Sequence, residues 1–296
     1  MNSMFRIGII TLACALNFGI VTVSGANTAH DRVGSALEVS AAPATTIVSE
    51  SPANSIDYAR NLFFQGEYEK ARQAGEALGV SQGSAQGYAL AAEAMSAQIM
   101  LGLLDKPHKQ SKRAFALAQK AIALDPEDQD AIMQYTLTYG FVTRTSLPLT
   151  AWRKKYPMKS LALIEGLQTD FPEDPRADAL LAAWHLGVVR KTGVKNGEKW
   201  FGARLDQGIE LYESAIRRAP DDIIIHSHFA LTRFVIDPEN YAKETQELLE
   251  KIAAMPAMTA IDRDVQSRMV EILDNFDNPK VAIKKSENFL DSKARA

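Results

Sequence analysis

From Ser55 onward, alanine and leucine recur three and four residues apart, and the alternation typical of a β-strand is nearly absent. This spacing predicts amphipathic helices along almost all of residues 55–296. The prolines cluster between the predicted helices, where they end a helix cleanly. We therefore expect an all-α fold.

One sequence pattern recurs, an amphipathic helix that ends in a short loop with a proline. The clearest copy spans residues 114–126, and further copies span 160–172, 208–220 and, more divergently, 244–256. The closing prolines lie 46, 48 and 36 residues apart, which is typical of a helical repeat. Shortly after each proline stands a residue suited to cap the next helix, and these predicted N-caps are Asp128, Asp174, Asp222 and Thr259.

Residues 62–71 (LFFQGEYEKA) resemble the tetratricopeptide repeat, a family of stacked helical hairpins. In that family a glycine lets two helices approach at the hairpin turn, a tyrosine fills the gap and an alanine permits close packing. Gly66, Tyr68 and Ala71 occupy these places here. The resemblance also implies that Ala182 and Ala230 are the small residues where first helices cross.

The resemblance covers about residues 55–275 and implies antiparallel helical hairpins. It leaves two arrangements open, an irregular right-handed solenoid and a compact bundle. Residues 143–157 and 192–201 make two repeats longer than the family's usual ~34 residues, and we interpret both as inserted loops. The run at residues 223–225 is predicted to be helical despite its three isoleucines, and residues 276–290 are expected to form a last, capping helix.

The N-terminal residues 1–26 are predicted to be a signal peptide. Arg6 precedes an apolar run over residues 7–23, and small residues follow up to Ala26, after which we expect cleavage. An uncleaved membrane anchor and a lipoprotein lipidated at Cys14 are the alternatives. Residues 27–54 are rich in Ala, Ser, Thr, Val and Pro and are predicted to be a disordered linker, so that 55–296 form the repeat domain.

Charge and cysteine content narrow the possible partners and sites. The formal net charge is −3, and no strongly basic stretch stands out, so we do not expect nucleic acid as a partner. Cys14 is the only cysteine, and cleavage after Ala26 would leave a mature chain without disulfides or thiolate metal sites. A membrane is expected to be contacted only through an uncleaved signal segment.

The histidines are the main candidates for metal binding or catalysis. His226 and His228 are two residues apart, which places them on different faces of a helix rather than on one metal-binding face. His185 falls where the repeat family has a large packing side chain, so we expect it to stack on the next helix and to bond locally. No serine stands in a Gly-x-Ser-x-Gly turn. We expect no catalytic residue, metal or cofactor, and no enzymatic activity.

The two insertions are candidates for recognition because loops on rigid scaffolds often carry it. The first places Arg153 and Lys154 beside Trp152, in the most basic local cluster of the chain, and the second contains Trp200 between lysines and glycines. The alternatives are a solvated run of charges in the first insertion and a helix connection with Trp200 packed inward in the second.

The resemblance also implies a binding surface on the first helix of each hairpin. For one hairpin this surface would contain Asp130, Met133, Leu137 and Phe141. For a later hairpin it would contain Ile224, Ser227, Leu231 and Phe234. The alternative is that these residues contact a neighbouring helix.

Together these features predict an exported, non-enzymatic interaction scaffold or adaptor of the cell envelope, most simply in a bacterial periplasm. It would bind an envelope protein or peptide on its helical surface. The alternative function is a small-molecule-binding accessory component of a periplasmic transport system. An enzyme would require one of the three histidines to meet a carboxylate in a cleft.

Overall fold

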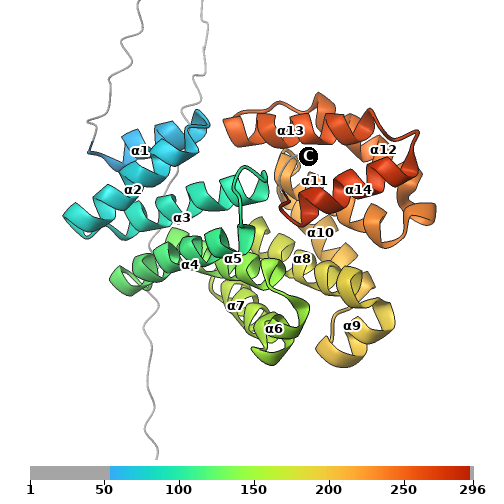
Figure 1. Cartoon of the computed structure of the whole chain (residues 1–296), viewed down its shortest axis with the longest axis horizontal. Helices are drawn as coiled ribbons and strands as arrows, with labels where there is room; N and C mark the ends of the chain where they lie inside the picture. Colours follow the sequence, from blue (N-terminus) through green and yellow to red (C-terminus); the bar gives the residue numbers. More distant parts are fainter. Residues whose placement is uncertain (1–53, 294–296) are drawn as a thin grey trace, which may run out of the picture. The chain divides into compact units, whose positions relative to one another are not determined.

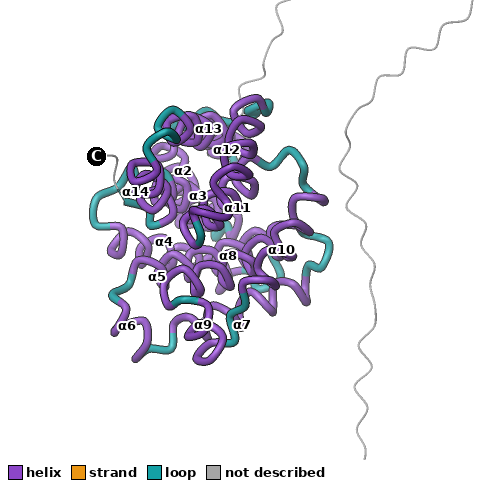
Figure 2. Tube along the Cα trace, turned by 90° about the vertical axis from the view of Figure 1, so that its right-hand side faces the viewer, coloured by secondary structure: helices purple, strands orange, loops and turns teal. Residues whose placement is uncertain are grey.

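A computed structural model describes residues 54–293 of the chain. Within this range the chain forms fourteen α-helices and no β-strand (Figures 1 and 2). The helices are α1 Ile56–Phe64, α2 Tyr68–Gln82, α3 Ala85–Met100, α4 Pro107–Leu124, α5 Gln129–Thr145, α6 Pro148–Arg153, α7 Tyr156–Asp170, α8 Pro175–Thr192, α9 Val194–Phe201, α10 Leu205–Arg218, α11 Ile223–Ile236, α12 Pro238–Ala254, α13 Ala260–Leu273 and α14 Pro279–Leu290.

The predicted signal peptide and the predicted linker up to residue 53 lie outside the described residues. None of the helices in the described range combines the length and the apolar character needed to cross a bilayer.

The helices of residues 54–293 pack as neighbouring pairs, which confirms the all-α hairpin architecture. The pairs are α1/α2, α3/α4, α5/α7, α8/α10, α11/α12 and α13/α14. Helices α6 and α9 stand outside this succession, because α5 packs directly on α7 and α8 directly on α10. The expectation that residues 143–157 and 192–201 are loops is wrong. Pro148 starts a helix in the first, and a helix between Gly193 and Gly202, both at positive φ, fills the second.

The four predicted N-caps are confirmed. The side chains of Asp128, Asp174 and Asp222 accept hydrogen bonds from backbone N–H groups in the first turns of α5, α8 and α11. Thr259 forms a reciprocal capping box with Asp262 at the start of α13. The isoleucine run is helical as predicted, and the predicted last helix is α14.

The turn between α1 and α2 brings the first hairpin against the sixth. Gly66 has φ +86°, and a Cβ there would lie 2.9 Å from the Cβ of Ala260 in α13. The hydroxyl of the buried Tyr68 donates to Oδ2 of Asp264 at 3.1 Å. The glycine is therefore needed for its backbone conformation and for contact with α13, as well as for the hairpin turn.

The largest apolar cluster is shared by the two ends of the described chain. It contains buried residues of α1–α5, such as Leu90, together with residues of α11–α14, such as Leu249 and Met269. Smaller clusters lie beneath α8 and α10 and between α7 and α8. Ala182 and Ala230 are fully buried, as predicted for residues at helix crossings.

Helices α2 and α3 approach so closely that only glycine fits at their crossing. A Cβ on Gly75 would lie 2.6 Å from the carbonyl oxygen of Gly87, and one on Gly87 would lie 2.7 Å from that of Gly75. Because the opposing atoms belong to the backbone, the two helices would have to separate to accept a methyl group.

We predict that Gly87→Ala lowers the free energy of unfolding by about 1 to 3 kcal/mol, because overpacking outweighs the better helix propensity of alanine. The matched control is Gly166→Ala in α7, where a Cβ meets nothing within 4 Å. The control is expected to stabilise by about 0.5 to 1 kcal/mol. Urea unfolding measures both, and equal effects of the two substitutions would contradict the close approach.

Candidate functional site

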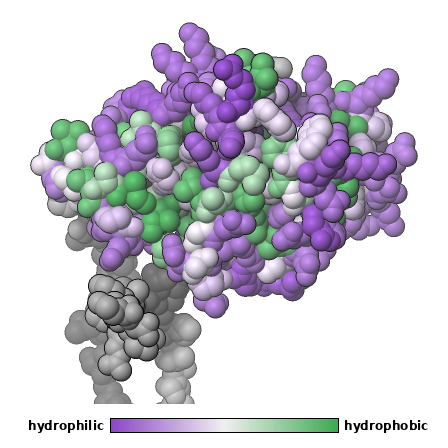
Figure 3. All heavy atoms as spheres, turned by 90° about the horizontal axis from the view of Figure 1, so that it is seen from below, coloured by the Kyte–Doolittle hydropathy of each residue, from purple (hydrophilic) through white to green (hydrophobic). Residues whose placement is uncertain are grey.

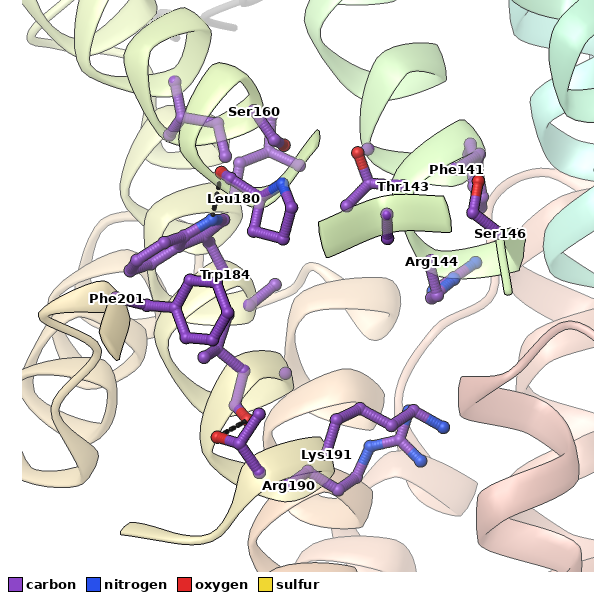
Figure 4. Close-up of a pocket in the computed structure, with 18 of the residues that line it drawn as sticks. Phe141, Thr143, Arg144, Ser146, Ser160, Leu180, Trp184, Arg190, Lys191 and Phe201 are labelled. Carbon is purple, nitrogen blue, oxygen red and sulfur yellow. Dashed lines mark hydrogen bonds between the residues drawn. The ribbon is translucent and has the colours of Figure 1, made fainter. Parts of the chain in front are cut away.

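A cavity of about 520 Å³ lies between α5, α7 and α8 and the two inserted helices α6 and α9 (Figure 4). Its volume is within the range of roughly 300 to 1,000 Å³ that is usual for small-ligand sites. Most of its lining is apolar, and charged groups gather where α5 and α8 end. The cavity therefore has an apolar body and a polar end.

Aromatic side chains from α6, α8 and α9 form one wall of the cavity. All three tryptophans of the chain, Trp152, Trp184 and Trp200, line it. The Trp152 ring meets Trp200 and Phe201 edge to face, at centroid distances of 6.0 and 5.6 Å. The indole N–H of Trp184 donates to the carbonyl of Pro157 at 2.8 Å, which fixes its orientation. The two insertions, far apart in sequence, thus meet through aromatic contacts.

Two glycines inside helices widen the cavity. Gly140 of α5 and Gly187 of α8 both line it, and a Cβ added to either would meet no atom within 4 Å. Glycine inside a helix is less stable than alanine by roughly 0.5 to 1 kcal/mol. No close packing requires a glycine at either position, and the missing side chains leave open space beside the aromatic wall.

The polar end of the cavity is cationic. Arg190 and Lys191, in the last turn of α8, both donate to Oδ1 of Asp291, at 2.5 and 2.9 Å. Asp291 is the C-cap of α14, so the last helix supplies the carboxylate. With Arg144 of α5, three cationic side chains line this end of the cavity, and Asp291 pairs with two of them. Figure 4 shows Arg144, Arg190 and Lys191 apart from Trp184 and Phe201.

Arg144 forms no ion pair with any residue in the range 54–293 within 4.0 Å. Its Nη2 donates to Oγ of Ser292 at 2.6 Å, and its guanidinium lies 4.6 Å from the ring centroid of Phe141. The Nε atom is buried and has no acceptor, although the residue as a whole retains some exposure. Burial, and then the charge of Arg190, lowers the pKa of Arg144 to about 10. The guanidinium therefore stays positive at neutral pH.

His228 lies behind this cationic end. Its ring packs on Phe289 at a centroid distance of 5.3 Å. Burial, followed by the positive charges of Arg144 and Arg190, lowers its pKa to about 3. His226 instead bonds through Nε2 to the carbonyl oxygen of Pro220 at 2.9 Å. The rings of His226 and His228 thus contact different groups.

His185 serves the packing role expected of it. Its Nδ1 accepts the backbone N–H of Arg204 at 3.1 Å, and its ring meets Trp184 at 5.1 Å. In the described part of the chain, no three His, Cys, Asp or Glu side chains are grouped so that they could hold a metal ion.

Large apolar side chains are exposed at the outer edge of the cavity. Trp152 and Trp200 line the cavity, and Leu147 and Leu149 flank Pro148, which also lines it. We call these four residues the rim, since all are more than half exposed. The exposed Arg153, Lys154 and Lys155 follow in the chain. Figure 3 views the molecule from the side of α6 and α9 and shows apolar residues on this face. The alternative in which Trp200 packs inward is therefore wrong, because Trp200 is 51% exposed beside Trp152.

The residues predicted to bind a partner lie in different places in the structure. Leu137, Phe141, Trp152 and Trp200 line the cavity. Arg153 and Lys154 are exposed beside it.

Two further predictions for the helical surface are corrected. Met133 is buried against Leu167 and Ala177 and is only 3% exposed. Asp130 pairs with Arg60 at 3.4 Å with its side chain 47% exposed, so its role in partner binding stays a prediction. Of the four residues predicted for the surface of the later hairpin, Ser227, Leu231 and Phe234 are buried. The alternative, contact with neighbouring helices, therefore holds for these three.

Sequence reasoning missed Arg144, Arg190 and Gly187 as parts of the site. Each arginine stands in the last turn of the helix that precedes an insertion, where a basic residue is also explained by the helix dipole. Only the long-range position of Asp291 shows that one arginine is paired and the other is not.

No protein-family model and no curated protein matches the chain. Solved structures that are similar to it include a human IFIT1 dimer with m7Gppp-AAAA and a monomeric IFIT1 mutant with Gppp-AAAA. They are 15% and 16% identical to this chain, each with a TM-score of 0.42, and each match covers 76% of this chain and 54% of the other. The chain thus spans about half the length of the structures it matches.

The expectation that nucleic acid is excluded is contradicted, because both matching structures were solved with a capped RNA. The sequence argument against nucleic acid relied on the net charge of the whole chain. A value of −3 averages over the whole surface, whereas Arg144, Arg190 and Lys191 concentrate positive charge in one place.

We predict that stability falls as the pH falls from 7 to 5, partly through His228. Its folded pKa of about 3 lies below the unfolded value near 6.5, so only the unfolded chain gains this proton. The contribution is fully present above about pH 6.5, and about 1 to 2 kcal/mol of it is lost by pH 5. Urea unfolding of His228→Gln should show a correspondingly smaller loss, and an unchanged loss would show that His228 titrates normally.

Proposed function

We propose that the protein is an exported, non-enzymatic binding protein of the cell envelope that holds an apolar segment of another envelope protein at the rim. The observation that carries this proposal is the meeting of α6 and α9, which presents Trp152 and Trp200 to solvent above a cavity. Neither helix takes part in the direct packing of α5 on α7 or of α8 on α10.

The side chains of the rim suit a protein partner. Large exposed apolar groups that gather on one face mark interaction sites, and tryptophan is enriched among the residues that dominate binding energy. The neighbouring Arg153, Lys154 and Lys155 would favour a partner with acidic residues beside its apolar segment.

The histidines give the proposal further support. His185 and His226 have backbone hydrogen-bond partners, and His228 lies against Phe289 among cationic neighbours. The function of a binding protein requires no proton transfer from any of them. Export rests on the pattern of residues 1–26, with its apolar run and small residues before position 27.

A second candidate function is that of a small-molecule-binding accessory protein for a periplasmic transport system. The observation that favours it is the form of the cavity, a volume of about 520 Å³ with an aromatic wall and charged groups at one end. Small-ligand sites commonly combine a mostly apolar lining with a few placed polar groups.

The partner proposal predicts capture that depends on the rim. The purified protein, immobilised and exposed to a nuclease-treated envelope extract, should recover one envelope protein reproducibly. The double variant Leu149→Ser/Trp152→Ser should reduce this recovery by about tenfold or more, because central aromatic residues dominate such interfaces. Quantitative mass spectrometry measures the recovery.

The matched control is Met258→Ser, which removes a large apolar side chain that is 81% exposed and lies outside the rim. It should leave recovery unchanged. Equal loss with both variants, or recovery of RNA or lipid in place of a protein when nuclease is omitted, would contradict the proposal.

A further inference from the structure

Arg144 is a partly buried cation without a matching anion. Its Nε is buried and unpartnered, and no carboxylate of the described residues forms an ion pair with it. Arg233 offers a direct comparison, because its Nε also lacks an acceptor but its Nη2 pairs with Glu244 at 2.9 Å. Removing a charge from water without a partner is costly, so Arg144 requires an explanation that Arg233 does not.

The surrounding groups do not neutralise Arg144. Asp291 already accepts bonds from Arg190 and Lys191, and Lys293 approaches it to 3.8 Å. Ser292 accepts a bond from Arg144 but carries no charge. Arg190, Lys191 and Lys293 thus share one carboxylate, and Arg144 has none, so an anion at this end of the cavity would find an excess of positive charge.

The rest of the cavity limits which kind of anion could bind there. Trp184 and Phe201 form an apolar wall, and Gly140 and Gly187 leave open space beside it. Figure 4 shows Trp184 and Phe201 across the cavity from Arg144. A polyanion would bring several charges against this wall, whereas a single anionic group on an apolar body matches both parts.

We infer that the cavity binds a small amphipathic monocarboxylate, with its carboxylate on Arg144 and its aromatic or branched apolar body against Trp184 and Phe201. A guanidinium presents several N–H groups that suit a carboxylate, and Arg144 lines the cavity with one hydrogen bond from its side chain, which Nη2 donates to Ser292. The inference rests on the cavity as a small-molecule site, the second candidate function, and is independent of partner binding at the rim.

The test uses three probes with the same naphthyl group and different charge: 1-naphthylacetate, the neutral 1-naphthylacetamide and the cationic 2-(1-naphthyl)ethylamine. Isothermal titration of the purified protein should show that the acetate binds at least about tenfold more tightly than the amide, because it gains a charge-assisted bond to the guanidinium. The cationic probe should bind most weakly.

Two substitutions of arginine separate the local charge from the general charge of the protein. Arg144→Met should abolish the preference for the acetate over the amide. The matched control, Arg217→Met, removes an exposed arginine of α10 outside the cavity and should preserve that preference. Arg144→Lys keeps the charge but loses the guanidinium, so it should retain part of the preference.

A second pair of variants tests the location of the probe. Gly187→Met should fill the cavity and weaken all three probes, whereas Gly166→Met, which also places methionine in open space on a helix, should not. Circular dichroism and thermal unfolding establish that each variant is folded. The comparison of probes on the unaltered protein needs no variant.

Several results would overturn the inference. Equal affinity for the acetate and the amide would leave an apolar small-molecule site without an anion subsite. Absence of binding by all three probes would reject the inference and the second candidate function together, and intact rim-dependent capture would then leave the partner proposal standing. Probe binding that survives Gly187→Met would place the probe elsewhere.

Discussion

The burial of apolar faces between successive hairpins is the interaction on which the rest of this structure depends. No single hairpin can bury its own apolar face, so each needs a neighbour. In this chain the first and sixth hairpins are also neighbours, through Gly66 against Ala260 and through Tyr68 and Asp264. The shared core of α1–α5 and α11–α14 follows from this closure. It frees α6 and α9 from any need to cover the ends of the array.

The chemistry of the candidate site lies where α5 and α8 meet the inserted helices α6 and α9. The hairpin cores are mostly apolar, although polar side chains such as Gln98 and Arg233 are also buried in them. Around the insertions, two glycines inside helices meet empty space, Trp152 and Trp200 stay exposed, and the Nε atom of Arg144 is buried without an acceptor. Local choices that oppose stability tend to concentrate at functional sites, because elsewhere they have no compensating use.

The sequence predicted what depends on nearby residues. Periodicity predicted the long helices but not the short α6 and α9, and prolines marked many helix ends. Asp128, Asp174, Asp222 and Thr259 were recognisable as caps because capping is decided within one turn. It could not show that α14 delivers Asp291 to Arg190, 101 residues earlier, and leaves Arg144 unpaired. Nor could it show that Met133 faces a neighbouring helix while Leu137, one turn later, faces a cavity, since both fit the same apolar period.

Trp152 of the rim meets Phe201 of the cavity wall edge to face, so the two proposed binding events act on side chains that are in contact. A ligand that packs beneath these rings would restrict their rotamers, and a protein laid over them would meet a surface already ordered. When one ligand has already ordered these side chains, the second ligand binds without that entropic cost, so the two affinities are coupled. Such coupling is reciprocal, because both binding energies refer to the same states of the protein. The aromatic contact between α6 and α9 is therefore the element through which a small carboxylate and an envelope protein would influence each other.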